Sequence, residues 1–164
     1  MSQIRLGIQQ RVLPHFRAPL YAAIARRISG CVEVFTGSVD SDEGVVEADG
    51  LEFGSWQLTT NLRFGWGNQR FYWQEGFTRW IDIYQPDVLA VECNPRIISN
   101  VVGFKKARDL SIPIIGWGMG VMGNADDKGF YGRGMKRYFA QFDAMIAYGT
   151  KGADDYAKEL IRTR

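Results

Sequence analysis

The chain has 164 residues, 46% of them hydrophobic, which is enough for one domain with a substantial buried core. Its 20 basic and 18 acidic side chains are dispersed, and the net charge of +2 argues against nucleic acid as a partner. No apolar run approaches the roughly 20 residues that span a bilayer, so we expect a cytoplasmic protein, with peripheral contact at the inner face of the membrane left open.

The first third of the chain alternates between strand and helix patterns. Apolar residues predict a strand over 4–13, and apolar residues at helical spacing predict a helix over 19–28. A second strand is expected at 31–35. The acidic, glycine-containing stretch 36–59 indicates a long loop, with one short strand near 58–62.

The rest of the chain repeats the alternation more regularly. It predicts helix 77–84, strand 87–92, helix 97–108, strand 113–117, helix 135–142, strand 144–148 and helix 153–161. Strands that are apolar on both faces, between helices that are apolar on one, require a parallel sheet covered on both sides. We therefore predict one α/β domain over residues 1–164 with a Rossmann-like, doubly wound parallel sheet.

Polar side chains follow two of these strands, at the edge where doubly wound folds bind ligands. His15, the only histidine, and Arg17 follow the first strand. We expect His15 to act as a general base or to orient a hydroxyl, and Arg17 to bind phosphate or carboxylate; a structural role for His15 is the alternative. Glu92, Asn94 and Arg96 follow a later strand. They are expected either to hydrogen-bond a polyhydroxylated substrate or to order the loop.

A glycine-rich turn follows the strand that ends near Trp117. Gly118–Gly123 matches the dinucleotide fingerprint G-x-G-x-x-G. In a working fingerprint a helix starts between the second and third glycines, whereas residues 124–129 are polar and predict a loop. We therefore expect no nicotinamide cofactor, and we expect Gly118 and Gly120, beside Trp117, to let the backbone approach a ligand or a facing domain.

The cysteines and the histidine do not form a metal-binding pattern. Cys31 and Cys93 both lie in apolar runs, which predicts two buried free thiols. With one histidine and no cysteine cluster, the sequence predicts no metal site.

Aromatic residues and arginines crowd the segment 63–80. Part of this segment is expected to belong to the core. The remainder is suited to stacking on sugar rings or lying at a lipid headgroup surface, with single-stranded nucleic acid as a weaker alternative.

Four segments carry a family resemblance: Leu13–Leu20 (LPHFRAPL), Gln85–Glu92 (QPDVLAVE), Ile112–Gly120 (IPIIGWGMG) and Phe142–Thr150 (FDAMIAYGT). In this succession they resemble the N-terminal domain of GT-B glycosyltransferases, especially glycosyltransferase family 4. The resemblance implies a domain that binds the acceptor, which is a glycan, a lipid or a small molecule. It also implies a second Rossmann-like domain, after residue 164, that binds the nucleotide-sugar donor.

The resemblance further implies roles for the residues at the sheet edge. His15 would position the acceptor, because the retaining group needs no protein base, and Arg17 would contact phosphate or acceptor. Glu92, Asn94 and Arg96 would line the cleft. The isolated chain should have little transfer activity, because both reactants must be held in one closed cleft. The alternatives are a non-catalytic binding or scaffold domain and half of a sugar-nucleotide epimerase.

Overall fold

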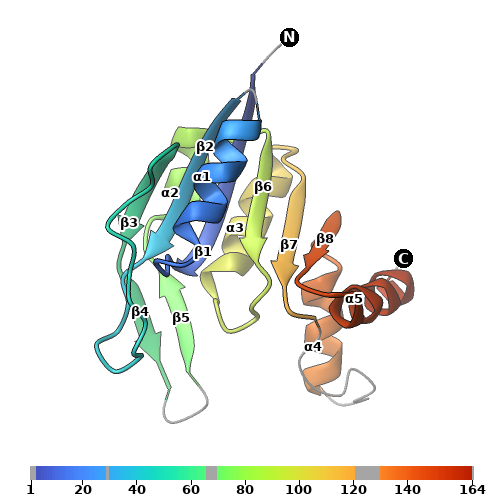
Figure 1. Ribbon diagram of the computed structural model, residues 1–164. Coiled ribbons are helices and arrows are strands. Elements are labelled where there is room, and N and C mark those ends of the chain that lie inside the picture. The colour runs from blue at the N-terminus through green and yellow to red at the C-terminus, as the bar shows by residue number, and fades with distance from the viewer. Residues whose placement is uncertain (1–2, 29, 66–69, 121–129, 164) are drawn as a thin grey trace.

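The computed structural model describes residues 3–28, 30–65, 70–120 and 130–163 (Figure 1). Its main sheet has six parallel strands in the order β3-β2-β1-β6-β7-β8. They are β1 (Ile4–Val12), β2 (Gly30–Gly37), β3 (Ser55–Thr59), β6 (Val88–Glu92), β7 (Ile114–Gly118) and β8 (Ala144–Ala147). The predicted Rossmann-like α/β fold is confirmed.

Helices cover both faces of this sheet. α1 (Ala18–Arg27) packs on one face, where its Tyr21 joins a core cluster with side chains of β1 and β2. On the opposite face lie α2 (Phe77–Tyr84), α3 (Ser99–Asp109) and α4 (Phe130–Phe139). The last helix, α5 (Thr150–Thr163), packs along β8 and against α4.

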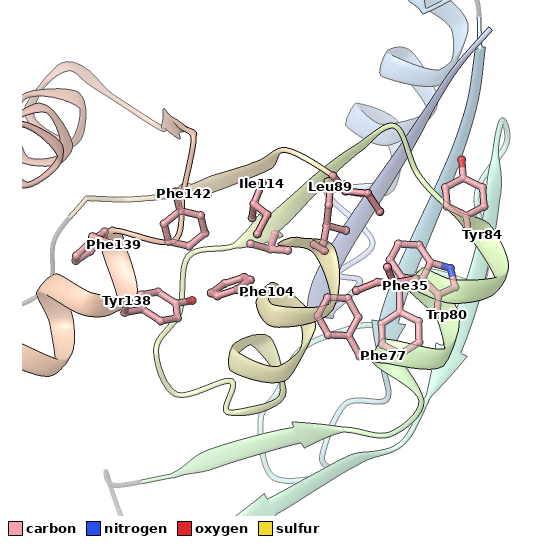
Figure 2. Close-up of a cluster of buried hydrophobic side chains, with 14 of the residues drawn as sticks. Phe35, Phe77, Trp80, Tyr84, Leu89, Phe104, Ile114, Tyr138, Phe139 and Phe142 are labelled. Atoms are coloured by element: carbon pink, nitrogen blue, oxygen red, sulfur yellow. The ribbon is translucent and has the colours of Figure 1, made fainter. Parts of the chain in front are cut away.

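The larger core cluster lies between the sheet and the helices α2, α3 and α4 (Figure 2). Phe77 and Trp80 of α2 lie 5.4 and 5.2 Å from Phe35 of β2, measured between ring centroids. Phe104 of α3 lies 5.2 Å from Phe142, which follows α4. Burying each such ring contributes about 1.5–3 kcal/mol, so the apolar stripe predicted for residues 77–84 is confirmed as the core face of α2.

The strand order reverses between β1 and β6. From β1 the chain moves outward through β2 to β3, and it then returns through α2 to β6, on the other side of β1. In open α/β sheets ligands bind where neighbouring connections diverge in this way, outside the carboxyl ends of the strands. The segments 13–17 and 92–96 lie at this point.

A two-stranded antiparallel hairpin, β4 (Asn61–Phe64) and β5 (Phe71–Gln74), was not expected from the sequence. The single strand predicted near 58–62 is in fact the end of β3 and the start of β4. Figure 1 shows the hairpin beyond the carboxyl ends of β1 and β2. Tyr72 is buried, as expected for the part of this segment that belongs to the core, whereas Phe64 and Phe71, a cross-strand pair, are 50% and 42% exposed. Stacking on sugars or contact with lipid stays a prediction.

A mostly buried ion pair fixes this hairpin to the domain. Arg11, in β1, donates to both carboxylate oxygens of Glu43, at 2.9 and 2.8 Å. The Tyr72 hydroxyl donates to Glu43 at 3.0 Å, and the Arg11 guanidinium lies 4.6 Å from the Tyr72 ring centroid. Glu43 thereby connects the long loop before β3 to both β1 and β5.

The two cysteines differ in exposure. Burial raises the pKa of the Cys93 thiol to about 12. Cys31 is exposed, so the prediction of two buried thiols is wrong for this residue. It is the second residue of β2, at the amino edge of the sheet, where a strand end is less covered than its middle.

Candidate functional site

Arg17 is the centre of a cluster at the carboxyl edge of the sheet. It is the N-cap residue of α1, and its side chain is half-buried. Its guanidinium donates a hydrogen bond to Oε1 of Gln10, at the end of β1. The same guanidinium lies 5.5 Å from the ring centroid of Trp117 and 5.7 Å from that of Tyr148. Both distances are within the range of a cation–π interaction.

The rings around Arg17 pack on one another. Tyr21, in α1, lies 5.6 Å from Trp117, and Trp117 lies 5.7 Å from Tyr148. Four separate parts of the chain thus converge: the end of β1, the start of α1, β7 and the residue after β8. The Arg17 cluster consists of Gln10, Arg17, Tyr21, Trp117 and Tyr148.

Glu92 faces the same cluster from β6. Burial raises the pKa of both Tyr21 and Tyr148, the positive charge of Arg17 lowers it, and the negative charge of Glu92 raises it. The net effect keeps both hydroxyls protonated at neutral pH. They are therefore hydrogen-bond donors as well as acceptors.

Glu92 and Asn94 also order the loop after β6. The Glu92 carboxylate accepts from the backbone N–H of Arg11 at 2.9 Å and from the Asn94 amide at 3.2 Å. Asn94 Oδ1 accepts from the backbone N–H of Arg96 at 3.1 Å, and the Arg96 residue is exposed. The loop-ordering alternative therefore holds for Glu92 and Asn94, and substrate binding by the three residues stays a prediction.

His15 lies in the same loop as Arg17 but outside the cluster. Its residue is exposed, and its Nδ1 lies 3.4 Å from the carbonyl oxygen of Val46. Its ring meets that of Phe16 edge-on, at 5.8 Å. These contacts leave the imidazole open to solvent, and its role in positioning an acceptor stays a prediction.

Gly118 and Gly120 face α5. A Cβ on Gly118 would lie 2.7 Å from the Tyr156 hydroxyl, and one on Gly120 would lie 2.9 Å from Cα of Gly152. The backbone N–H of Gly120 also donates to the Tyr156 hydroxyl at 3.1 Å. The neighbour of this backbone is α5 of the same domain, and the expected approach to a ligand or a facing domain stays a prediction. Residues 121–123 of the fingerprint match lie outside the described residues.

Gln10, Tyr21 and Tyr148 are not among the residues predicted from the sequence. A signal for Gln10 exists, because Gln9 and Gln10 are adjacent amides in a central strand and both are fully buried. Buried amides need partners. The Gln9 amide donates to the side chain of Gln74 in the hairpin. The Gln10 amide instead accepts from Arg17 and belongs to the Arg17 cluster. No comparable signal marks the two tyrosines.

A separate cavity of about 690 Å³ lies between α3 and α4. It is lined by Pro95, Val101, Phe104, Lys105, Arg108, Gly134, Met135, Arg137, Tyr138 and Gln141. Only Pro95 comes from the carboxyl-edge loop, and none of the predicted site residues lines this cavity. The chemistry of the candidate site therefore lies with the Arg17 cluster.

In the described part of the chain, no group of three or more His, Cys, Asp or Glu side chains is arranged to hold a metal ion. None of the helices there combines the length and apolar character that a membrane crossing requires.

The fold has counterparts among solved structures, although no family model and no curated protein matches the sequence. A crystal structure of UDP-N-acetylglucosamine 2-epimerase is similar to 96% of this chain, with a TM-score of 0.55 and 11% identity. UDP-GlcNAc 2-epimerase from Methanocaldococcus jannaschii aligns with 98% of the chain, with a TM-score of 0.49 and 12% identity. The chain covers 45% and 42% of these structures, which is less than half of their length. The first similarity establishes a shared fold and nothing finer.

Proposed function

We propose that this chain is the acceptor-binding half of a glycosyltransferase that moves a sugar from a nucleotide-sugar to a hydroxyl acceptor. The observation that carries the proposal is the Arg17 cluster, at the point where the strand order reverses. The apolar faces of sugars stack on aromatic rings, and their hydroxyls need donors and acceptors together. The cluster offers one exposed aromatic residue, Tyr148, beside the buried ring of Trp117, and Glu92 adds a carboxylate.

Each residue at this edge has a role in the proposal. Arg17 contacts a charged group of the substrate, and Tyr148, supported by Trp117, stacks on a sugar ring. The exposed imidazole of His15 positions the acceptor hydroxyl. Glu92 accepts hydrogen bonds, while Asn94 and Arg96 border the site.

The proposed enzyme needs a second domain. In this scheme a second Rossmann-like domain supplies the nucleotide-sugar and closes over the carboxyl edge of the sheet. The acceptor is a glycan, a lipid or a small molecule. Because transfer requires both reactants in one closed cleft, the 164-residue chain alone is expected to be inactive.

The epimerase half is the second candidate, and the observation that favours it is the similarity to the UDP-N-acetylglucosamine 2-epimerase structure. An epimerase acts on a nucleotide-sugar alone, whereas a transferase needs an acceptor. The two candidates therefore differ in a reaction requirement that an assay can measure.

The test is to express the chain extended to the natural end of its gene and to supply nucleotide-sugars with and without a panel of acceptors. Release of nucleotide diphosphate that depends on an acceptor supports the transferase. Acceptor-independent interconversion of two epimeric nucleotide-sugars supports the epimerase. A gene that stops at residue 164, together with no saturable binding of any sugar, would leave the stand-alone binding or scaffold domain.

A further inference from the structure

Three buried hydrogen-bond donors surround Arg17 without a partner among the described residues. They are Nε2 of Gln10, the hydroxyl of Tyr21 and Nε1 of Trp117. Their residues are 0%, 1% and 9% exposed. Arg17 is close enough to lower the pKa of Tyr21, but a guanidinium only donates, so the tyrosine proton still lacks an acceptor.

Unpaired buried donors are costly and uncommon. Each one loses its water without replacement, at a cost of about 1–3 kcal/mol. Native proteins therefore pair nearly all such groups, and the exceptions need a reason. Three of them around one guanidinium indicate a place where a ligand supplies the missing acceptors.

Arg17 also has no described carboxylate in direct contact, although Glu92 faces the cluster. Its hydrogen-bond partner Gln10 is neutral, and no described carboxylate lies within 4.0 Å of its guanidinium nitrogens. The Glu92 carboxylate accepts instead from Arg11 N–H and Asn94. Arg11 shows the usual solution in this chain, because Glu43 neutralises it at 2.8 Å.

The start of α1 adds to this positive field. Arg17 is its N-cap residue, no side chain caps the helix, and the first turn contains no acidic residue. A helix N-terminus carries a partial positive charge and favours anions. In α1 Pro19 has no N–H and the Leu20 N–H donates to the Arg17 carbonyl oxygen at 3.0 Å, so the contribution here comes from the dipole and not from a row of free N–H groups.

We infer that the Arg17 cluster binds an anionic oxygen group, a phosphate or a carboxylate, of the substrate. The assignment of this anion to a sugar substrate rests on the proposed function. The guanidinium binds two of its oxygens, and Gln10, Tyr21 and Trp117 donate to the remaining lone pairs. Tyr148, at the edge of the cluster, is 50% exposed.

The test uses inorganic phosphate and acetate as separate probes on the 164-residue chain. The ¹H–¹⁵N signal of the Trp117 indole, identified by its loss in Trp117→Phe, is followed at constant ionic strength in chloride buffer. We expect this signal to shift saturably with one or both anions and not with chloride alone. A response to phosphate only assigns a phosphate site, and a response to acetate only assigns a carboxylate site.

The variant Arg17→Gln should weaken anion binding at least about tenfold, because hydrogen bonds to charged groups are the stronger ones. Arg79→Gln, which makes the same charge change on an exposed residue of α2, should bind as the parent chain does. If the amide spectrum shows that Arg17→Gln does not fold, Arg17→Lys is the second variant. It keeps the positive charge but lacks the planar guanidinium that can bind two oxygens at once, so it should bind the anion severalfold more weakly than the parent chain.

A Trp117 signal that stays fixed with both anions would overturn the inference, as would equal binding by Arg17→Gln and the parent chain. These results do not depend on transfer or epimerase activity. Anion binding without acceptor-dependent turnover would remove the proposed function and leave the anion site.

Discussion

Gly103 of α3 gives the sharpest test of how α2 and α3 pack. A Cβ at this position would lie 2.1 Å from Cε1 and 2.6 Å from Cδ1 of Phe77 in α2. The Phe77 ring is 1% exposed and packs against both Phe35 and Trp80, with centroids at 5.4 and 6.0 Å. The ring cannot move away from α3 without displacing these core neighbours.

Two opposing effects decide the outcome of Gly103→Ala. Alanine in a helix interior is favoured over glycine by about 0.5–1 kcal/mol. Overpacking a core costs about 1–3 kcal/mol, and an overlap of this depth, against normal carbon contacts of about 3.5–4.0 Å, belongs at the upper end. We expect a net loss of about 2 kcal/mol in the free energy of unfolding.

Gly134→Ala is the matched control. Gly134 lies in α4, and a Cβ there would meet nothing within 4 Å. Only the helix preference acts, so this variant should gain about 0.5–1 kcal/mol. Urea unfolding of both variants measures the difference. A Gly103→Ala chain as stable as the parent would refute the packing of α2 on α3 described above.

Three further predictions concern the site and its supports. Gly118→Ala should lower the free energy of unfolding by about 1–3 kcal/mol, because its Cβ overlaps the Tyr156 hydroxyl. The double variant with Tyr156→Phe should lose less than the sum of the two single variants. Additive losses on urea unfolding would contradict this. With its pKa raised to about 12, Cys93 should stay protonated and react slowly with a thiol reagent at pH 8, while exposed Cys31 reacts. Because Cys93 loses its proton more readily once unfolded, its contribution to the free energy of unfolding should fall as pH rises from about 9 towards 12, by at most about 1.4 kcal/mol per pH unit. Buried tyrosines whose pKa is also raised add to this fall above about pH 10. A flat profile, or two equally fast thiols, would count against this burial. Glu43→Ala should speed amide hydrogen exchange in β4 and β5 by removing a mostly buried ion-pair partner, worth about 2 kcal/mol; unchanged exchange there would contradict its role in holding the hairpin.

The main sheet was predictable because its strands are encoded locally. The runs 87–92 and 113–117 are apolar on both faces, as a central parallel strand requires, and glycine or proline lies near their ends. Both became neighbouring strands of the sheet, β6 and β7. Alternation with amphipathic helices then leaves few topologies open.

The hairpin was not predictable, because its polarity is the reverse of the usual one. Its inward face is polar: the Asn61 amide donates to the carbonyl oxygen of Arg11 at 2.8 Å, and Gln74 donates to that of Gln10 at 2.9 Å. Its outward face carries exposed Phe64 and Phe71. A pattern analysis assigns apolar residues to the core, so only the contacts with β1 show which face is buried.

The site was predictable at the level of strand ends but not of side-chain contacts. Arg17, Glu92 and Trp117 follow or end strands, and the rule for ligand sites in doubly wound sheets selects them. Tyr21 lies one turn into α1 and Tyr148 follows β8. Their approach to Arg17 depends on how α1 and β8 lie against β7, which no local pattern specifies.

Arg11 and Arg17 show that two arginines close to the end of one strand can have different roles. Arg11 lies in β1, and Arg17 follows β1 at the start of α1. Arg11 forms a structural ion pair with Glu43, which lies in the long loop before β3. No described carboxylate forms an ion pair with Arg17. Its guanidinium lies beside unpaired donors, near the point where the strand order reverses. Gln10 and the rings of Trp117 and Tyr148 compensate the guanidinium charge only with neutral groups. The unpaired donors beside this charge are therefore the strongest physical reason to expect an anionic ligand there.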